Sequence, residues 1–343
     1  MYELFYGLQE RPFDLTASPR FLFLTTKHRE ALSNLQYGIS GQKGITLLVG
    51  EAGTGKTTLV RAALDLHRTQ NVTSVYVNNP TLTRAEFLEM LALGYGLGRH
   101  AALSKTRFLA DLERSVLDRH RAGGISALLV DEAQSLPGEL LEEIRLLSNL
   151  ETRSAKLLPV VLIGQPELAD RLNDASLRQL KQRLALRCTL EPLDLRETAG
   201  YITKRIRIAG GDSASMFTRE AVERIYEHSR GIPRTVNVIC DNALLTGFAL
   251  DRRMVDADIV MEVCRDFDLN GGDGHHHRRA AGVAAPSHAI QSAATRAGRP
   301  SAAGTPGMTG KAAVTSGAGT PPAVMPAKEM FTEVTKRRRF SFF

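Results

Sequence analysis

The stretch "GEAGTGKTT", residues 50 to 58, constrains the fold of this chain more than any other part of the sequence. It fits the pattern G-x-x-x-x-G-K-[ST], with the apolar run "ITLLVG" before it and the helical pattern "GKTTLVRAALDL" overlapping its end. Glycines allow consecutive backbone N–H groups to surround phosphate oxygens at the start of a helix. These flanking elements disfavour the alternative, a chance glycine-rich turn. The sequence therefore predicts a phosphate-binding loop.

The residue types of this loop suit a nucleoside triphosphate with a divalent cation. Lys56 is expected to reach the β- and γ-phosphates, and the Thr57 hydroxyl is expected to ligate Mg²⁺. The residues expected to bind nucleotide are Gly50, Glu51, Ala52, Gly53, Thr54, Gly55, Lys56, Thr57 and Thr58.

Short apolar runs alternate with amphipathic segments between residues 45 and 190. The runs "ITLLVG", "VTSVYVN", "ALLVDE", "VVLIGQ" and "CTL" read as buried strands, with helical patterns between most of them. This alternation is typical of an α/β unit with a mostly parallel sheet. We expect a five-stranded sheet, preceded by an N-terminal leader, within residues 1–192.

The strands stop after Pro192, and four short helical patterns follow one another. Asp194, Thr218 and Asp256 are placed to cap three of these helices, and Pro233 suits the first position of a fourth. Residues 193–269 are therefore expected to form a small all-helical lid domain. Residues 270–343 are rich in Ala, Gly, Ser, Thr and Pro, which predicts a disordered tail.

Two adjacent carboxylates follow the apolar run "ALLV". Asp131 stands at the end of this strand, where a carboxylate can hold the shell of a magnesium ion. Glu132 beside it can orient and deprotonate an attacking water, which favours hydrolysis over transfer to another acceptor. The alternative is a solvated strand end, which a phosphate-binding loop upstream makes less attractive.

Further polar residues follow the later strands. Gln165 ends "VVLIG" and could hydrogen-bond the γ-phosphate or its water, or it could simply begin a polar loop. The segment "SLRQLKQRLALRCTL" carries cations that could project to a neighbouring subunit's nucleotide as an arginine finger, or could form a solvated helix face. Arg183 is our first choice and Arg178 our second, ahead of Lys181 and Arg187.

Arg234, in "SRGIPRTVNVI", stands in the first turn of a helix that begins at Pro233. A cation gains nothing from the local helix dipole at this position. We therefore expect the helical domain to bring Arg234 across a cleft to the γ-phosphate, so that lid closure and nucleotide state are coupled. The alternative is an ordinary surface arginine.

Composition adds limits to these expectations. The formal charge is +7, but residues 1–269 hold 34 Lys and Arg against 34 Asp and Glu, so the tail carries the excess. A neutral body gives no bulk electrostatic signal for DNA. The three cysteines, Cys188, Cys240 and Cys264, lie in apolar surroundings, as expected of buried thiols in a reducing compartment.

Localisation is read from the absence of targeting signals. The first residues, "MYELFYGLQERPFDL", do not resemble a signal peptide, and no window approaches the roughly 18 apolar residues of a membrane span. We expect a cytoplasmic protein that is at most peripheral at the inner membrane.

Four motifs together resemble the AAA+ ATPases: "GEAGTGKTT" as Walker A, "LLVDEAQ" as Walker B, "IGQPEL" at the sensor 1 place and "GIPR" at sensor 2. The leader "FYGLQERPFDLTASPRFLFLTTKHREALSNLQYGI" resembles the general secretion pathway protein A group, which is related to transposition ATPases of the TniB, TnsC and MuB type. The resemblance implies Mg²⁺-dependent ATP hydrolysis and a homo-oligomeric ring or filament. It also implies that the adenine packs near the leader around Pro12 and Phe13.

Two function classes follow from the resemblance. The first is an ATPase that assembles or remodels a protein complex in envelope secretion. The alternative is a DNA-binding regulator of the transposition type, whose ring or filament would line DNA with Arg99, Lys105 and Arg107. The tail's "KRRRFSFF" could contact an anionic membrane surface, a nucleic acid or an acidic partner, or could be a solvated chain end, and His275–His277 lack the spacing of a designed metal site.

Overall fold

A computed structural model gives the structure of the chain and describes residues 1–16, 19–67, 71–78, 81–98, 101 and 104–267. Its sheet has five parallel strands in the order β2-β3-β4-β1-β5. The strands are β1 (Ile45–Gly50), β2 (Val72–Val77), β3 (Ile125–Val130), β4 (Val160–Gly164) and β5 (Leu184–Leu190). The expected five-stranded sheet is confirmed, and every strand pair in it is parallel.

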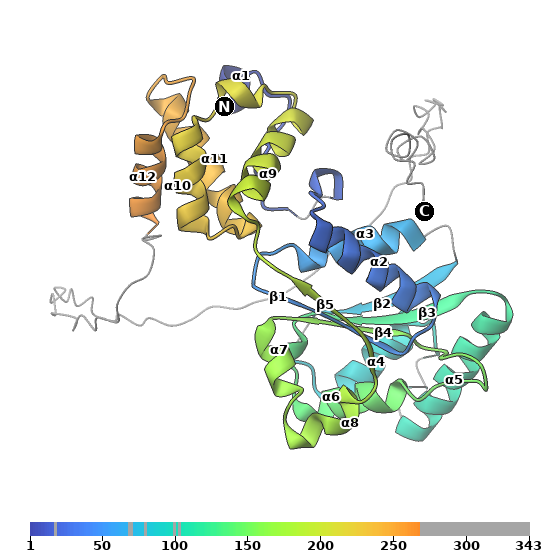
Figure 1. Cartoon of the computed structure of the whole chain (residues 1–343). Coiled ribbons are helices and arrows are strands. Elements are labelled where there is room, and N and C mark those ends of the chain that lie inside the picture. Colours follow the sequence, from blue (N-terminus) through green and yellow to red (C-terminus); the bar gives the residue numbers. More distant parts are fainter. Residues whose placement is uncertain (17–18, 68–70, 79–80, 99–100, 102–103, 268–343) are drawn as a thin grey trace, which may run out of the picture. The chain divides into compact units, whose positions relative to one another are not determined.

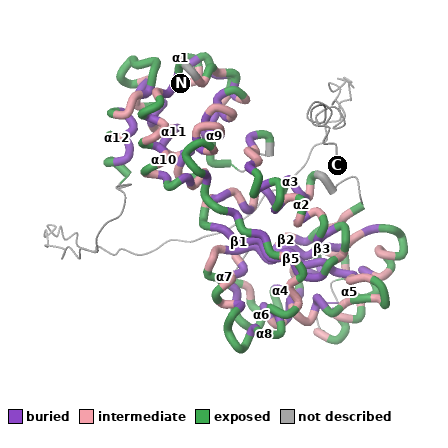
Figure 2. Tube along the Cα trace, in the orientation of Figure 1, coloured by how far each residue is buried: buried purple, intermediate pink, exposed green. Residues whose placement is uncertain are grey.

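Side chains alternate between the two faces of this sheet, as the pleat requires. On one face, Leu47, Leu128 and Leu162 join a cluster with apolar residues of the helices that Figure 1 shows below the sheet. On the other face, Leu48 and Leu129 pack against the helices above it. Both faces are covered, which explains why the three central strands β1, β3 and β4 read as continuous apolar runs and are buried in Figure 2. The edge strands β2 and β5 are only partly buried, so the expectation of five buried strands holds for the central three.

Helices of the α/β part fall into two groups. The face that includes Leu48 is covered by α2 (Thr26–Ser40) and α3 (Lys56–His67). The opposite face is covered by α4 (Arg84–Gly94), α5 (Lys105–Arg121), α6 (Gly138–Leu147), α7 (Pro166–Arg171) and α8 (Arg178–Lys181), with the short 3-10 turns η4 (Ala133–Ser135) and η5 (Ala175–Leu177) between them. The sheet is therefore the middle layer of a three-layer unit.

Four helices follow the last strand: α9 (Leu195–Ile208), α10 (Arg219–Ser229), α11 (Pro233–Ala249) and α12 (Ala257–Asp266), with the 3-10 turn η6 (Ser213–Ser215) after α9. Asp194 and Glu197 form a capping box at α9, and the Thr218 and Asp256 side chains accept from backbone N–H groups at α10 and α12. Pro233 occupies the start of α11. The sequence located all four helix starts because three carry a side chain that accepts from exposed N–H groups, and the fourth carries a proline, which suits the first helical position.

The N-terminal leader packs with these C-terminal helices. It contains α1 (Tyr2–Phe5) and the 3-10 turn η1 (Pro19–Phe21) before α2 begins. Tyr2, Leu8 and Phe13 are buried in the same apolar cluster as α9 to α12. The division expected from the sequence stays a prediction, with domains at residues 1–192, 193–269 and 270–343. The structure adds that apolar side chains of the leader contribute to the core of the helical part.

Candidate nucleotide site

The side chain of Lys56 is buried and hydrogen-bonds to the backbone of the loop after β1. The Lys56 Nζ donates to the carbonyl of Gly50 at 2.7 Å and to that of Glu51 at 3.0 Å. Gly53 and Gly55 have φ of +84° and +97°, a region that a side chain disfavours. Burial lowers the pKa of Lys56, while Glu132 and Asp131 act in the opposite direction. The loop therefore presents a cation within a curled backbone.

Asp131, at the end of β3, reaches the start of α3. Its Oδ2 accepts from the Thr57 hydroxyl at 2.9 Å and from the hydroxyl of Tyr76 on β2. Burial and the neighbouring carboxylate raise the pKa of Tyr76, which keeps its hydroxyl a donor. A hydroxyl and a carboxylate oxygen side by side are the kinds of ligand that Mg²⁺ takes. The residues present therefore fit the expected metal position.

Glu132 has a left-handed backbone, with φ of +51°, directly after Asp131. Its Oε2 accepts from Gln134 Nε2 at 2.5 Å and lies 3.5 Å from Gln165 Nε2. Gln165 follows β4, which pairs directly with β1, so Gln165 stands beside the loop strand as the sequence suggested. In the structure, Gln165 contacts the carboxylate of Glu132 and does not line the cavity described below.

Arg234 lies against the phosphate-binding loop. Its backbone N–H donates to the carbonyl of Gly53 at 3.2 Å, and a Cβ at Gly53 would approach Arg234 Cβ to 2.7 Å. The arginine side chain is exposed. The expected approach of the third lid helix to the loop is therefore present in the backbone.

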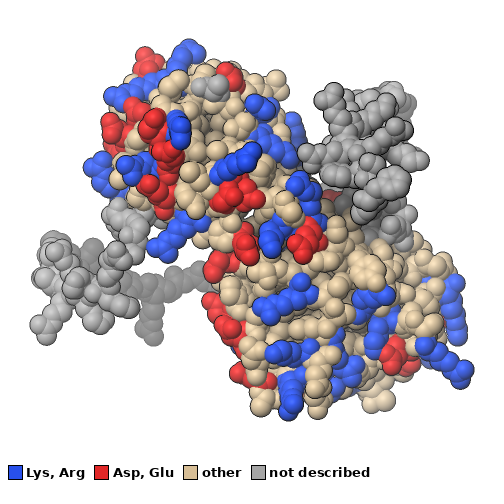
Figure 3. All heavy atoms as spheres, in the orientation of Figure 1, with Lys and Arg blue, Asp and Glu red and all other residues tan. Residues whose placement is uncertain are grey.

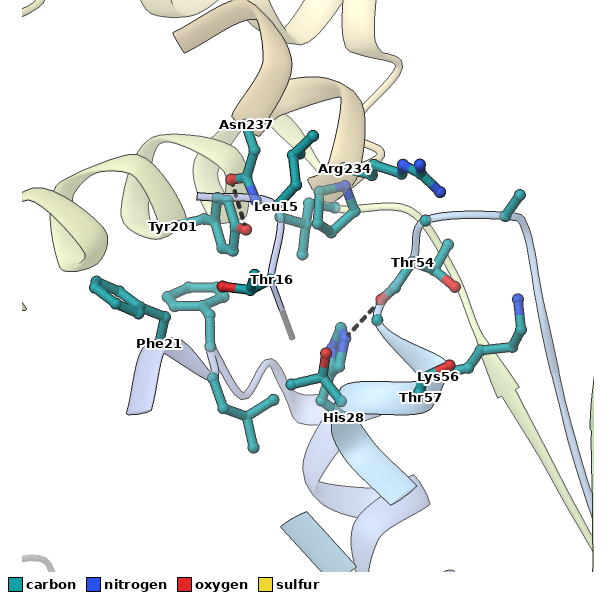
Figure 4. A pocket seen from close by; sticks show the side chains of 18 of the residues that line it. Leu15, Thr16, Phe21, His28, Thr54, Lys56, Thr57, Tyr201, Arg234 and Asn237 are labelled. Atoms are coloured by element: carbon teal, nitrogen blue, oxygen red, sulfur yellow. Dashed lines mark hydrogen bonds between the residues drawn. The ribbon is translucent and has the colours of Figure 1, made fainter. Parts of the chain in front are cut away.

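One cavity of about 370 Å³ joins the loop, the leader and the helical domain. Figure 4 shows Lys56 and Thr57 at one part of it and Arg234, Asn237 and Tyr201 at another. Its lining residues are Leu15, Thr16, Phe21, Leu22, Phe23, His28, Ala52, Gly53, Thr54, Gly55, Lys56, Thr57, Thr58, Glu132, Leu193, Tyr201, Arg205, Pro233, Arg234 and Asn237. The structure thus gathers most loop residues with Glu132 and Arg234.

The leader contributes an apolar part of this cavity. Leu15 and Phe21 line it, whereas Phe13 is only 1% exposed and packs on Phe217 in the helical core. The leader residues that line the cavity therefore differ from Pro12 and Phe13, around which the resemblance implied that the adenine packs. His28 is buried at the cavity, and burial lowers its pKa despite the nearby Thr54 carbonyl.

The candidate finger residues do not line this cavity. Arg178 begins α8 and is exposed, and Arg183 is half-buried just before β5. Lys181 donates to Asn173 at 2.6 Å, and Arg187 is exposed on β5. These positions stay candidates for contact with a second copy of the chain.

Several residues of the site were missed from the sequence. Gln134 and Tyr76, which bind the two carboxylates, and Tyr201 and Asn237, which line the cavity, were not singled out. Gln134 stands two positions after Glu132, a spacing that could have drawn attention to it. Tyr201 and Asn237 lie inside amphipathic helices, where their burial reads as core packing. Only the fold reveals that both face a cavity.

The comparisons with known proteins agree with this geometry. Residues 39–172 match the family described as AAA domain. The parallel sheet, the phosphate-binding loop after β1 and the helical lid are those of the AAA+ fold, which confirms the expected fold class. The match to the AAA domain family bears out the expected enzyme class. Within this class, the chain is 42% identical over 265 residues to General secretion pathway protein A of Aeromonas hydrophila. The expected resemblance to that group is confirmed as well.

That alignment covers 76% of this chain and 48% of the relative, so the chain spans about half the length of the curated relative that it matches. Among solved structures, the ORC2 protein of Aeropyrum pernix is 18% identical, with a TM-score of 0.56 and coverage of 75% of this chain and 72% of that one. Cdc6p of Pyrobaculum aerophilum is 17% identical, with a TM-score of 0.58 and coverage of 74% and 70%. At this identity, the two structures support the fold alone.

Other expectations fall partly outside the described residues. The tail from residue 270, including His275–His277 and the "KRRRFSFF" end, lies beyond them, as does Arg99. In the part of the chain that the structure describes, no helix combines the length and hydropathy needed to cross a membrane. Cys188, Cys240 and Cys264 are free and buried, as their apolar surroundings predicted.

Proposed function

We propose that this chain binds ATP with Mg²⁺ at the cavity and hydrolyses it. The observation that carries the proposal is that one cavity contains Lys56, Glu132 and Arg234, which come from three separate segments. A lysine for the phosphates, a carboxylate for the attacking water and an arginine for the developing charge are the parts that phosphoryl transfer to water needs.

The proposed roles follow from the contacts. Lys56 and the loop N–H groups bind the phosphates, and Thr57 with Asp131 would hold Mg²⁺, which neutralises phosphate charge when bound. Glu132 orients the water and takes its proton. Gln134 and Gln165 contact Glu132 Oε2, so we assign them to positioning this carboxylate.

The test compares phosphate release with nucleotide binding. Glu132→Gln is expected to bind ATP and to lose at least about 100-fold in turnover, because an amide cannot accept the proton. Lys56→Ala is expected to lose ATP binding. Glu139→Gln, an exposed residue of α6, is the matched control and is expected to behave as wild type. Normal turnover in Glu132→Gln would sink the hydrolytic mechanism.

We further propose that hydrolysis drives the assembly or remodelling of a protein complex in envelope secretion, with the chain acting as a homo-oligomeric ring or filament. The identity to General secretion pathway protein A supports the secretion assignment. The direct contact between Arg234 and Gly53 supports a lid whose position depends on the occupied loop. The tail is proposed to contact an anionic membrane surface or an acidic partner.

A DNA-binding regulator is the alternative to this proposal. On the face that Figure 3 shows, Lys and Arg gather over the α/β part. However, two cations suggested for a DNA path already have acidic neighbours: Lys105 donates to the buried Glu143 at 2.8 Å, and Arg107 lies 3.8 Å from Asp111. These pairs reduce the charge available to phosphates.

Co-sedimentation with double-stranded DNA near physiological salt separates the two functions. The full chain is compared with a chain ending at Asn270, each with and without ATP. The secretion proposal expects no binding, or binding that disappears with the tail. Retention that requires ATP and survives truncation would give the lead to the DNA-binding alternative.

A further inference from the structure

We propose that Asn237 recognises the purine base, donating from its side-chain Nδ2 to a ring nitrogen, and that Tyr201 and Arg205 fix the orientation of this amide. The proposal deepens the proposed function and rests on it. Its basis is a hydrogen-bond network that runs from the leader through Arg205 and Tyr201 to Asn237 at the cavity.

The donor and acceptor roles in this hydrogen-bond network follow from which groups carry hydrogen. A guanidinium has donors and no acceptor, so Arg205, at 2.8 Å from the Tyr201 hydroxyl, must donate to it. The hydroxyl's own hydrogen then goes to Asn237 Oδ1, also at 2.8 Å, as drawn in Figure 4. Since the amide oxygen is used in this bond, the amide nitrogen is the atom left for other partners.

Arg205 is held in place at the leader end of the hydrogen-bond network. It is buried, donates to the backbone carbonyls of Pro12 and Asp14, and stacks with its guanidinium carbon 4.7 Å from the centre of the Phe21 ring. None of the ion pairs formed by described residues includes Arg205, so backbone carbonyls and a hydroxyl satisfy its donors. The leader thereby sets the position of Arg205, the cation at which the hydrogen-bond network begins.

Asn237 is placed to use its free donor in the cavity. It is only 6% exposed and lines the cavity, and among the described residues its Nδ2 makes no hydrogen bond. Asn237 lies three residues after Arg234, so both side chains share one face of α11, about 4.5 Å apart along the axis. The helix thus presents a cation to the phosphates and, one turn later, an amide donor beside the apolar leader residues.

The chemistry of this donor suits a purine. Adenine carries acceptor nitrogens at its N1, N3 and N7 positions, and a base that displaces water from the amide must accept its N–H, because an N–H that a ligand buries without a partner costs free energy. Leu15 and Phe21 supply apolar surface for the ring at the same part of the cavity. A base nitrogen facing Asn237 would accept a hydrogen bond from its Nδ2, the amide atom that does not take part in the bond to Tyr201.

The experiment measures dissociation constants for ATP and for 1-deaza-, 3-deaza- and 7-deaza-ATP, each of which lacks one ring nitrogen. With wild type, one analogue is expected to bind about 3- to 10-fold more weakly than ATP. Asn237→Leu is expected to bind ATP as weakly as wild type binds that analogue, and to bind ATP and the analogue with equal affinity. Asn237→Asp keeps the side-chain shape and the Tyr201 bond, but replaces the donor by an acceptor, and is expected to lose at least as much.

Tyr201→Phe tests the positioning role. It frees the amide to rotate, so the ratio between ATP and the affected analogue is expected to shrink, which a purely structural role would not cause. Asn242→Leu is the control on the same helix, because Asn242 donates to the Val238 carbonyl and does not line the cavity. Inorganic tripolyphosphate, which has no base, is expected to bind every variant equally.

The outcomes separate the two proposals. If wild type binds ATP but all three analogues bind as tightly, or if the loss persists in Asn237→Leu, the base-recognition role is overturned and nucleotide binding stands. If wild type binds neither ATP nor tripolyphosphate, the proposed function fails and the role of Asn237 fails with it.

Discussion

At the scale of single residues, Arg234 is a cation in a position that its own helix makes unfavourable. The N-terminal end of α11 carries partial positive charge, and Asp or Glu would be stabilised there. The residue nevertheless lies over the phosphate-binding loop, with its backbone bonded to Gly53. An anion bound in the cavity would offset this local cost, which supports the proposed role of Arg234 toward a phosphate ligand.

Replacing Arg234 with Ala is therefore expected to uncouple binding from hydrolysis. ATP affinity should change little, because Lys56 and the loop still hold the phosphates, whereas turnover should fall about 100-fold with the loss of one transition-state donor. Arg219→Ala, in the first turn of α10 and paired with Glu223, is the matched control. Parallel loss of affinity and turnover, measured by titration and phosphate release, would contradict this assignment.

At the scale of elements, the leader and the helical lid behave as one packing unit. Tyr2 donates to Asp241, Tyr6 donates at 3.0 Å to the Arg252 carbonyl, and the Phe5 and Phe248 rings meet edge to face at 5.4 Å. Lys204 of α9 adds a bond of 2.9 Å to the Leu22 carbonyl. The short α1 could not persist alone and depends on these partners.

Phe13→Ala is expected to lower the free energy of unfolding by about 3–5 kcal/mol, because it empties a site that is only 1% exposed. Leu4→Ala, at a side chain that is 90% exposed, should stay within about 0.5 kcal/mol of wild type. Denaturant unfolding measures both. Equal stabilities for the two variants would show that the leader does not belong to the helical core.

The same elements show what a sequence can predict. Strands buried on both faces give apolar runs, and helix starts carry capping residues such as Asp194 and Thr218, so both could be located locally. The partner of the leader could not, because its apolar residues meet helices distant in sequence. Likewise Lys56 and Glu132 follow strands in a recognisable pattern, whereas Asn237 acquires a role only when three segments enclose a cavity.

At the scale of the whole molecule, the proposed finger makes activity depend on assembly. Arg178 and Arg183 lie away from the cavity of their own chain, as an arginine acting on a neighbouring copy must. Turnover per subunit is therefore expected to rise with protein concentration until the oligomer is complete. Either variant, Arg183→Ala or Arg178→Ala, should keep ATP binding and lose the concentration-dependent part of turnover.

Arg219→Ala, in the first turn of α10 and outside the candidate segment, is the control for this experiment because its guanidinium already pairs with Glu223. Turnover and mass are measured together over a dilution series. A turnover number that stays constant while the oligomer dissociates would remove the arginine-finger proposal.

The packing of the leader on the last helices also sets an order of events during synthesis. Tyr2, Leu8 and Phe13 are synthesised long before Cys264, which belongs to the cluster that buries them. At about 5–20 residues per second, these side chains wait roughly 10–50 s for their partners. The α/β unit can fold in the interval, so the nascent chain exposes the apolar side chains of the leader until α9 to α12 have been made.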